Sequence, residues 1–466
     1  MMCGAFHFTD MTDITDLITG INDVLWGYVL ILLLCGTGVY FTFRLRFIQI
    51  RKFTEAWRTL FRRQEGERKA GEMTPLQALA TAVAAQVGTG NLAGAATAIV
   101  SGGPGAIFWM WVSAFFGMAT VYAEATLAQK YRLHEHGEMT GGPAYYIRAA
   151  FHGVFGKILA GVFAVCCCAA LGFTGIMVQA NSIGSAFGEI FKERSFDVPA
   201  LAVGGVVALA AGAIFFGGTQ RLAKAVVRIV PLMAAVYIVG SLIFIAANAA
   251  ALPEAVRLIF VGAFDPQAAA GGALGITVRE AVRYGVARGL FSNEAGMGST
   301  PHAHARAAVK DPNRQGMIAM LSVFIDTFII LNLTVLVILT SGVLNSDGGN
   351  ALTGIDLTQA AFGSLFGGFG NAFVAVCLFF FAFSTILGWH FFGAINFKYI
   401  FKGRGAKIYS AAVLAFIVAG TMLKVECVWQ LADFFNGLMV LPNLLALVVL
   451  GKIVSKISEN ADAPHP

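Results

Sequence analysis

The chain has 466 residues, of which 57% are apolar and only 12% are charged. Together with a mean hydropathy of +0.74, this composition excludes a soluble protein and predicts an integral membrane protein that crosses the bilayer many times. The net charge of +6 would suggest a nucleic acid partner in a soluble protein, but in a membrane protein the side on which the basic residues lie matters more, and we expect no such partner.

Eleven apolar segments predict eleven transmembrane helices, because each comes close to the length that spans the hydrocarbon. A further apolar run, residues 253–264, is too short to span and starts at a proline, so it predicts a helix on the outer surface. The eleven segments cover residues 24–43, 75–100, 106–130, 158–183, 199–216, 229–247, 274–299, 317–341, 369–397, 408–423 and 428–450.

The loop after the first segment, residues 44–69, is the most basic part of the chain. The positive-inside rule places it in the cytoplasm, which puts the N-terminus outside and the C-terminus inside. Within this loop Phe53, Trp57 and Phe61 recur at helical spacing among arginines. Residues 47–61 therefore predict either an amphipathic helix on the inner membrane surface or a solvated basic loop.

Two of the apolar segments are interrupted in the middle, at residues 86–91 (QVGTGN) and 289–299 (GLFSNEAGMGS). Glycines and polar side chains weaken a helix, and an unpaired backbone group in hydrocarbon is costly, so such interruptions persist where something uses them. Transporters use them, because a helix broken near the membrane midplane directs free amide groups at an anion and free carbonyls at a cation.

The positions of the two interruptions predict an internal repeat. Without the extra N-terminal helix, residues 24–43, ten segments remain, and the interrupted ones are the first and the sixth. The five-helix halves, residues 75–248 and 274–450, are then inverted relative to each other, as in the repeat-built transporters. The fold class that we predict is an all-α polytopic membrane protein, residues 1–466 forming one transporter domain with a five-plus-five inverted-repeat core.

Several glycine-rich motifs occur along the chain: VGTGNLAG at residues 87–94, GGPGA at 102–106, GGP at 141–143, and GLFSNEAGMGS at 289–299 followed by PHAHA at 301–305. These motifs resemble those of the alanine or glycine:cation symporter family, and the resemblance extends over almost the whole chain. It implies the leucine-transporter fold and sodium-coupled symport of a small neutral amino acid, typically alanine or glycine, across a bacterial or archaeal inner membrane. We expect sodium as the co-transported ion, no organic cofactor, localisation in the bacterial inner membrane and function as a monomer.

An amino acid zwitterion needs hydrogen-bond donors for its carboxylate and acceptors for its ammonium. The uncoiled backbone of the first break would supply free N–H groups at the positive end of the following half-helix. Carbonyls and side-chain amides at both breaks would accept from the ammonium, and the glycines leave little room for a long side chain. The predicted substrate-binding residues are Gln86, Gly88, Thr89, Gly90, Phe291, Asn293 and Trp389.

A sodium site is implied by the family resemblance. Its predicted ligands are the backbone oxygens of Ala84 and Val87 and the hydroxyls of Ser384 and Thr385, because helix-end carbonyls and hydroxyls provide oxygens without burying a fixed charge. The alternative for the two hydroxyls is hydrogen bonding to their own helix. Trp389, one turn beyond Thr385, falls on the same face and would form a wall of the substrate pocket.

Three acidic residues inside the membrane, Glu124, Glu294 and Asp326, are functional candidates by default. By the fold resemblance, Glu124 accepts hydrogen bonds from uncoiled backbone near residues 292–294. Glu294 would coordinate the ion, relay a proton or cap the following half-helix, and its position in the motif leaves these roles open. Asn91, Glu124 and Glu294 are therefore predicted as structural or coupling residues.

Other functions fit the sequence less well. Proton coupling through Glu294 and Glu124 is the main alternative within transport, whereas a channel would need a continuous polar stripe. A membrane enzyme would need a nucleophile, a base and an orienting group at catalytic spacing, and we expect no enzyme. His302 and His304 lie at a cytoplasmic helix end without a cysteine or acid cluster, and predict interfacial hydrogen bonding rather than a metal site.

Overall fold

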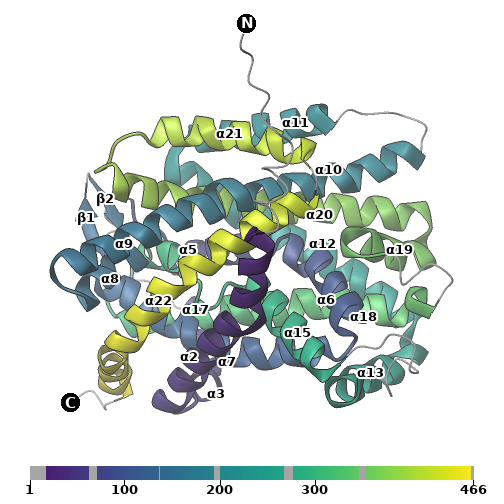
Figure 1. Cartoon of the computed structure of the whole chain (residues 1–466), viewed down its shortest axis with the longest axis horizontal. Helices are drawn as coiled ribbons and strands as arrows, with labels where there is room; N and C mark the ends of the chain where they lie inside the picture. Colours follow the sequence, from purple (N-terminus) through teal and green to yellow (C-terminus); the bar gives the residue numbers. More distant parts are fainter. Residues whose placement is uncertain are drawn as a thin grey trace, which may run out of the picture.

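The computed structural model describes residues 17–61, 71–135, 137–193, 200–266, 277–345, 352–423 and 425–462. These residues are almost all helical (Figure 1). The described strands form one antiparallel hairpin, β1 (Leu133–Glu135) and β2 (Glu138–Thr140), in which Leu133 lies opposite Thr140.

The helices follow one another with short connections, and several are interrupted by π-helical or 3-10 segments, labelled η. In chain order they are η1 (Leu25–Val29), α2 (Leu30–Arg44), α3 (Ile48–Arg51), α4 (Phe53–Phe61), α5 (Pro75–Gln86), η2 (Gly90–Gly94), α6 (Ala95–Gly102), α7 (Ala106–Lys130), α8 (Pro143–Ala150), α9 (Gly153–Cys167), η3 (Cys168–Gly175), α10 (Ile176–Glu193), α11 (Ala200–Phe215), α12 (Gly218–Ala247), η4 (Ala249–Ala251), α13 (Leu252–Phe264), α15 (Val278–Asn293), α16 (Pro301–Ala305), α17 (Pro312–Val323), η5 (Phe324–Leu331), α18 (Asn332–Thr340), η6 (Val343–Asn345), α19 (Gly354–Phe366), α20 (Gly368–Ile400), α21 (Ala406–Met422) and α22 (Val425–Asp462).

Among the described residues, 7 helical stretches are long and apolar enough to cross a membrane, or 8 if the bent pair formed by α5 and η2–α6 counts as one span. The protein is therefore a multi-pass membrane protein. The other three predicted spans fall on α11 and α21, which are apolar but shorter, and on α15 with the uncoiled residues that follow it. The number eleven stays a prediction, and the start of the seventh predicted segment, residues 274–276, lies outside the described residues.

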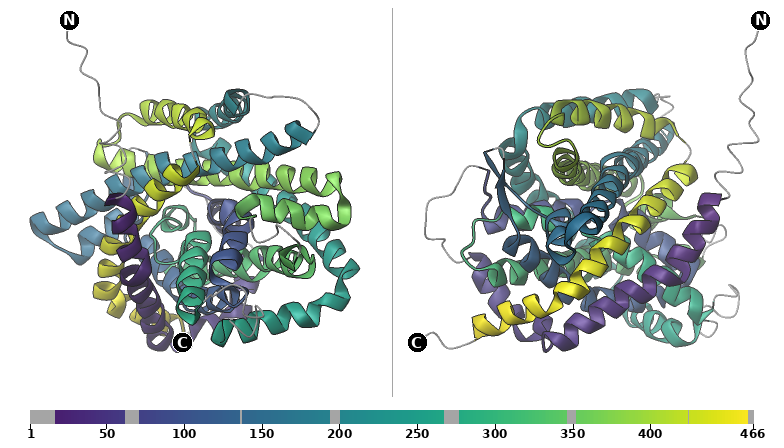
Figure 2. Two further views of the ribbon diagram at one scale, coloured as in Figure 1. Left: turned by 45° about the vertical axis from the view of Figure 1, so that its right-hand side comes forward. Right: turned by 60° about the vertical axis from the view of Figure 1, so that its left-hand side comes forward.

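The N-terminal helix lies along the outside of the C-terminal one. The right-hand view of Figure 2 shows α2 and α22 running side by side. At one end of this contact the indole N–H of Trp26 donates to the carbonyl of Asp433 at 2.9 Å, and at the other Arg44 Nε donates to Ser455 Oγ at 2.9 Å. The predicted extra helix thus covers one side of α22.

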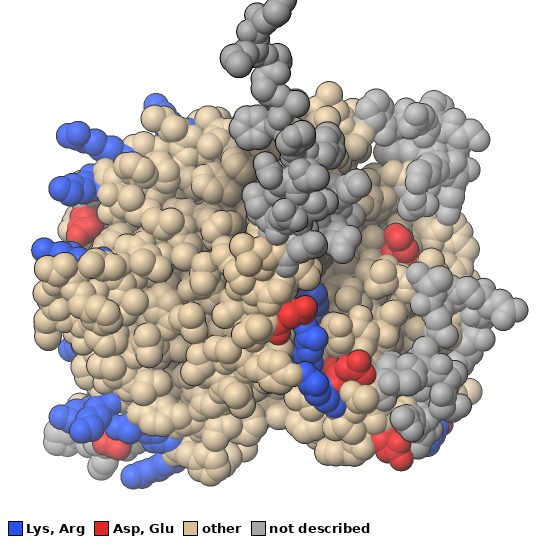
Figure 3. All heavy atoms as spheres, in the orientation of Figure 1, with Lys and Arg blue, Asp and Glu red and all other residues tan. Residues whose placement is uncertain are grey.

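Much of the molecular surface is apolar, as a bilayer requires. Large aliphatic side chains face outward, among them Leu32, Leu209 and Ile408, each more than 70% exposed. Figure 3 shows a broad area left of the centre that is free of charged side chains, and a small group of acidic and basic side chains right of the centre. Most Lys and Arg in this view gather at the left edge and lower left corner. In Figure 1 this side carries β1, β2, α3 and the C-terminal end of α22, segments that the positive-inside rule assigns to the cytoplasm.

The basic loop is helical where it is described. Residues 48–61 form α3 and α4, which supports the amphipathic helix over the solvated loop. Ala56 and Leu60 are buried, and the ring centroid of Phe53 lies 4.8 Å from that of Phe324. The apolar face of α4 thus packs onto the protein, while the basic residues 62, 63, 68 and 69 lie outside the described residues.

Candidate functional site

The first break is a bend within the predicted second span. α5 starts with a capping box formed by Thr74 and Gln77 and ends at Gln86, after which the backbone of Val87 is extended. The helix then resumes at 51° to α5. The N–H of Gly88 donates to Asn91 Oδ1 at 3.0 Å, so an asparagine side chain closes the turn in place of a helical carbonyl.

The second break is a longer uncoiled segment, residues 294–300, between α15 and α16. Glu294 has a left-handed backbone with φ of 55°, and Gly296 and Gly298 have φ of 81° and 82°. A left-handed non-glycine residue costs about 1–3 kcal/mol and persists where surrounding contacts determine it. The backbone here is therefore fixed by its neighbours rather than by helix propensity.

The two breaks lie against each other. Gln86 Nε2 donates to the carbonyl of Asn293 at 2.6 Å. A Cβ added to Gly90 would lie 3.1 Å from Ser292 Cα, so glycine at position 90 permits a close approach of the two backbones. Residues some 200 positions apart in the sequence thus meet at one buried point.

Two of the three N–H groups that the sequence predicts to be free at the first break, those of Gly88 and Thr89, are already hydrogen-bonded. Asn91 accepts from Gly88, as described, and Gln179 Oε1 on α10 accepts from the N–H of Thr89 at 3.2 Å. Gln179 Nε2 also donates to Thr89 Oγ1 at 3.0 Å. The sequence analysis did not identify Gln179, although a fully polar amide inside a long apolar run is a usable signal.

The side-chain oxygens predicted to accept from the substrate ammonium differ in whether they already have a hydrogen-bond partner. Gln86 Oε1 is buried and has no hydrogen-bond partner among the described residues. The side chain of Asn293 is already engaged, since Nδ2 donates to Thr327 Oγ1 at 3.2 Å and Oδ1 accepts from the N–H of Ala295 at 3.1 Å. Gln86 therefore carries the available side-chain acceptor, and Asn293 holds the end of α15 in place.

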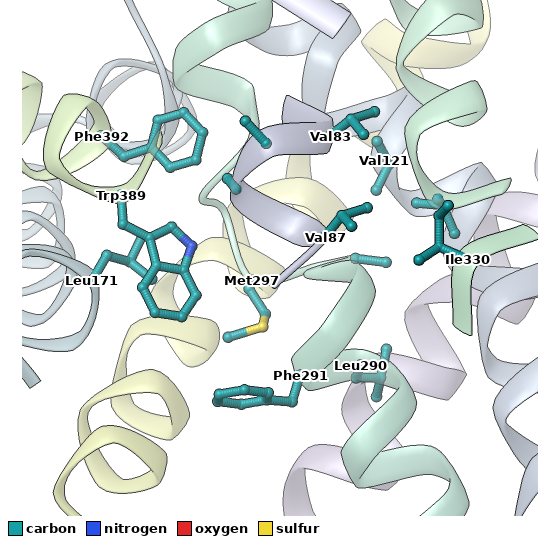
Figure 4. Close-up of a cluster of buried hydrophobic side chains, with 14 of the residues drawn as sticks. Val83, Val87, Val121, Leu171, Leu290, Phe291, Met297, Ile330, Trp389 and Phe392 are labelled. Carbon is teal, nitrogen blue, oxygen red and sulfur yellow. The ribbon is translucent and has the colours of Figure 1, made fainter. Parts of the chain in front are cut away.

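The aromatic residues predicted to line the pocket are buried near the second break. Trp389 donates from Nε1 to Glu294 Oε1 at 2.5 Å, and the ring centroid of Phe291 lies 5.2 Å from that of Trp429. In the view of Figure 4 the side chain of Met297 lies between those of Trp389 and Phe291. Trp389 and Phe291 thus pack on one side of the uncoiled segment, together with Met297 of that segment.

The four predicted cation ligands come together in the structure. Thr385 Oγ1 donates to the carbonyl of Ala84 at 2.9 Å and to that of Val87 at 3.3 Å, and Ser384 Oγ lies 3.4 Å from the same Ala84 oxygen. Both hydroxyls also contact the carbonyl of Phe381 in their own helix. The two alternatives from the sequence therefore coexist, and the hydroxyls bridge α20 to the end of α5.

Glu124 on α7 is buried and forms hydrogen bonds with the backbone of the second break. Its carboxylate accepts from the N–H groups of Gly296 at 3.2 Å and Gly298 at 3.0 Å, slightly further along the chain than the predicted residues 292–294. Asn443 Nδ2 on α22 donates to the same carboxylate at 2.6 Å and to the Gly296 carbonyl at 2.9 Å. Glu124 and Asn443 together hold the uncoiled backbone.

The other two intramembrane acids contact the breaks from different sides. Besides Trp389, Glu294 accepts from the hydroxyl of Ser299, and no contact to the first N–H groups of α16 is formed among the described residues. Asp326 lies in the π-helical segment η5 and accepts from Asn91 Nδ2 at 2.7 Å and from Ser292 Oγ at 3.0 Å. Asp326 thus links the first break to the second.

His302 and His304 form hydrogen-bond contacts, as the sequence predicts, and both side chains are buried inside the protein. His302 Nδ1 lies 2.7 Å from the Ser299 carbonyl and Nε2 lies 2.8 Å from Asn396 Nδ2, while His304 Nδ1 lies 2.8 Å from Gln315 Nε2. They lock the inner end of the second broken helix against α20 and α17. No group of three or more metal-binding side chains occurs among the described residues.

Ion pairs and backbone bridges close the side of the protein that carries the basic loops. Glu138 on β2 accepts from Arg306 at 2.8 Å and lies 3.3 Å from Lys398 Nζ on α20. Burial alone would raise the pKa of Glu138, but the two cations outweigh it and hold this pKa below its ordinary value. Met73 also pairs with Arg306 and Ala308 through the backbone, so the inner ends of both broken helices are joined.

On the opposite side, a cavity of about 510 Å³ extends between η2–α6, α10, α15, the start of α19 and α22. Arg288 and Asp433 line it and lie 3.6 Å apart. Trp429, which also lines it, contacts both Arg288 and the ring of Phe291. The cavity therefore reaches the residues that cover the second break from this side.

The membrane-spanning helices and the two facing breaks define the class of protein, a polytopic transporter with discontinuous helices. The fold is similar to that of MhsT in its crystal structure with L-phenylalanine, with a TM-score of 0.58 over 85% of this chain and 100% of that chain, at 13% sequence identity. This likeness establishes the leucine-transporter fold.

The chain belongs to the sodium:alanine symporter family, whose sequence pattern matches residues 11–462. It is 41% identical to the sodium/alanine symporter AgcS of Methanococcus maripaludis over 95% of this chain and 96% of the relative. It is also 43% identical to an uncharacterized transporter of Haemophilus influenzae, over 96% of each chain, and 41% identical to the probable sodium/glutamine symporter GlnT of Bacillus subtilis, over 95% of this chain and 90% of the relative. The protein is a membrane transporter and not an enzyme.

Proposed function

We propose that this protein takes up a small neutral amino acid, alanine or glycine, together with sodium across the bacterial inner membrane. One observation carries the proposal. Gln86, in the first break, donates a hydrogen bond to the backbone of Asn293, at the end of α15, and its buried side-chain oxygen has no partner among the described residues. A substrate ammonium is a donor that would satisfy this oxygen, and it would do so where both broken helices meet.

The carboxylate of the substrate would bind at Gly88, Thr89 and Gly90. In the structure Gln179 Oε1 accepts the hydrogen bond from the N–H of Thr89. A bound carboxylate would take the place of this amide oxygen and would accept a hydrogen bond from Gln179 Nε2. The half-helix that follows turns its positive end toward this position, which favours an anion. This arrangement supports recognition of the α-amino acid backbone rather than of a side chain.

Preference for a small side chain is supported by the residues around the uncoiled segment. Trp389, Phe291 and Met297 are large and each is at most 5% exposed. A Cβ added to Gly175 would lie 2.5 Å from the Trp389 ring, so the indole has little freedom to retreat. Because one relative is named for alanine and another for glutamine, these two amino acids are the substrates to compare in transport assays.

Sodium would bind between α5 and α20, with the carbonyls of Ala84 and Val87 and the hydroxyls of Ser384 and Thr385 as ligands. The Thr385 hydroxyl now contacts both carbonyls, and the Ser384 hydroxyl lies 2.9 Å from the Phe381 carbonyl in its own helix and 3.4 Å from that of Ala84. Rotation of a hydroxyl presents its lone pairs instead, so the same four oxygens are able to surround a cation. Because α5 belongs to a broken helix, a cation here would couple to the substrate site.

Alternating access would proceed by movement of the broken helices against the surrounding ones. The closed ion-pair network at Glu138 and the cavity near Arg288 support a state that opens toward the outside. In this proposal the N-terminus is outside and the C-terminus is cytoplasmic. The eleven transmembrane helices comprise one extra N-terminal helix, residues 24–43, and two inverted halves of five helices each, residues 75–248 and 274–450. Asn91, Glu124 and Glu294 act as structural or coupling residues, and the protein works as a monomer.

Uptake of radiolabelled alanine into proteoliposomes tests the proposal. An inward sodium gradient is compared with an inward proton gradient of equal size. We expect accumulation with sodium alone. Accumulation driven by protons alone would move the coupling to the intramembrane acids, and no accumulation under either gradient would contradict the proposed substrate or the transport direction.

A further inference from the structure

A small pocket lies where the loop from α2 to α3 meets the last turns of α22, far from the two breaks. Figure 1 shows these segments at the lower left, and basic side chains gather at the same corner in Figure 3. No ion pair among the described residues joins the glutamate of this pocket to Arg44 or Arg46, so the pocket keeps an excess of positive charge. The polar side chains that line it are Arg44, Arg46, Arg51, Ser455, Ser458 and Glu459.

The guanidinium of Arg44 is held in place with part of it unused. Its Nε donates to Ser455 Oγ at 2.9 Å and to the Gly451 carbonyl at 3.3 Å, and its Cζ lies 5.4 Å from the ring centroid of Tyr40. The two terminal nitrogens, Nη1 and Nη2, have no hydrogen-bond partner among the described residues. A fixed guanidinium with both terminal nitrogens available suits a phosphate, because two N–H groups bond two oxygens and little side-chain freedom is lost on binding.

Two further side chains of the pocket lack a partner. Ser458 is only 5% exposed, and its hydroxyl forms no hydrogen bond with the described residues. A buried hydroxyl without a partner is uncommon and calls for one. Arg46 is exposed, and its guanidinium is likewise without a partner in the described part of the chain. An anion in the pocket would accept hydrogen bonds from both side chains.

The pocket lies at the depth where the apolar surface of the protein ends. On α22 the outward side chains change within about one turn from Val448 and Val449, each about half exposed, to the exposed Lys452. Beside the arginines, Phe43 and Ile50 are each 64% exposed. Such a change from apolar to basic side chains marks the level of the lipid headgroups. A phosphate at this level carries acyl chains, which would pack on the exposed apolar side chains.

We propose that this pocket binds the phosphate of an anionic phospholipid from the leaflet that faces the cytoplasm in the proposed orientation. Basic pockets between transmembrane helices on this side favour anionic headgroups, which bring no cation of their own to compete with the arginines. The pocket has a volume of about 20 Å³, close to the room that one water-sized atom needs. One phosphate oxygen would enter and bond Ser458, and the others would lie at the mouth between Arg44 and Arg46. The lipid would thus join the loop after α2 to the end of α22.

Native mass spectrometry of the purified full-length protein, titrated with single lipids, tests the proposal. Phosphatidylglycerol is the anionic probe, and phosphatidylcholine is the comparison because its choline neutralises the phosphate. We expect the wild type to bind phosphatidylglycerol about tenfold more tightly than phosphatidylcholine. Arg46→Gln removes a cation that contacts no described residue, so the fold is kept and most of this preference should be lost. Arg404→Gln is the matched control, because Arg404 is also exposed but lies outside the pocket, and it should keep the preference.

Ser458→Ala separates a built pocket from a diffuse basic surface, because it leaves every charge in place. We expect it to weaken the binding of phosphatidylglycerol about fivefold, and unchanged binding would overturn the pocket. Equal binding of the two lipids by the wild type, or an equal loss in Arg46→Gln and Arg404→Gln, would also overturn it. Displacement of phosphatidylglycerol by an excess of inorganic phosphate would indicate a site for a soluble anion and would contradict the lipid site.

Discussion

Gly88 is the position at which a single methyl group tests the cation site. A Cβ added there would lie 2.5 Å from Thr385 Oγ1 and 3.0 Å from Gln179 Oε1. Ordinary contact begins near 3.4 Å, so in Gly88→Ala the threonine hydroxyl has to retreat by about 0.9 Å or rotate away. Threonine is stiff at χ1, and any retreat takes its oxygen away from the carbonyls of Ala84 and Val87.

Overpacking of this kind costs about 1–3 kcal/mol. If the cost is borne by the cation site, the affinity for sodium falls roughly 5- to 150-fold. We therefore expect Gly88→Ala to raise the sodium concentration for half-maximal alanine uptake by this factor. The assay is alanine uptake into proteoliposomes over a series of sodium concentrations, with equal amounts of inserted protein.

Gly94→Ala is the matched control, because a Cβ there meets no atom closer than 4.0 Å and its backbone is helical. This variant should keep the wild-type sodium dependence. The reasoning fails if Gly88→Ala also keeps it. It fails equally if Gly94→Ala loses sodium affinity to the same extent, since the effect would then reflect helix packing in general.

Four further changes give distinct outcomes. Gln86→Ala removes the available acceptor for the ammonium, a bond worth about 1.5–3 kcal/mol, and should weaken alanine binding roughly 10- to 150-fold in a scintillation binding assay, whereas unchanged binding would remove this residue from the site. Ser384→Ala combined with Thr385→Ala should raise the half-maximal sodium concentration at least about tenfold, and an unaltered sodium curve counts against that cation site. Trp389→Ala should increase the uptake of leucine relative to alanine about tenfold, while wild-type selectivity would show that another group sets the size limit. Glu138→Gln should lower thermal stability near pH 7; because the pKa of Glu138 is held below its ordinary value, its contribution is present at neutral pH and is lost as the pH falls through that lowered pKa, so equal stabilities of variant and wild type at pH 7 would contradict it.

The sequence predicted the breaks because they depend on local chemistry. Glycines and amides in the middle of an apolar run weaken the helix wherever it lies. The predicted interruptions, residues 86–91 and 289–299, contain the bend after Gln86 and the uncoiled residues 294–299, whereas residues 289–293 still belong to α15. The pairing of Ser384 and Thr385 with Ala84 and Val87 came from a family resemblance, and their contacts are present. What each site residue binds is a separate question, which the proposed experiments address.

The partners of the breaks were harder to predict because they come from distant helices. Gln179 and Asn443 each lie in a long apolar segment and contact residues about 90 and 319 positions away. A pattern within one short stretch of sequence does not predict contacts between residues so far apart. The same limit applies to His302 and His304, because the sequence predicts their hydrogen bonding but not their partners, which lie on α17 and α20.

The central claim is that substrate and sodium bind together where the two breaks meet. The most direct test is alanine binding to the purified protein in sodium and in an inert organic cation at equal ionic strength. Coupling free energies between sites are about 1–3 kcal/mol, so we expect alanine affinity to be at least about fivefold higher in sodium, and alanine to tighten sodium binding by the same factor. Equal affinity in both salts would contradict a shared site.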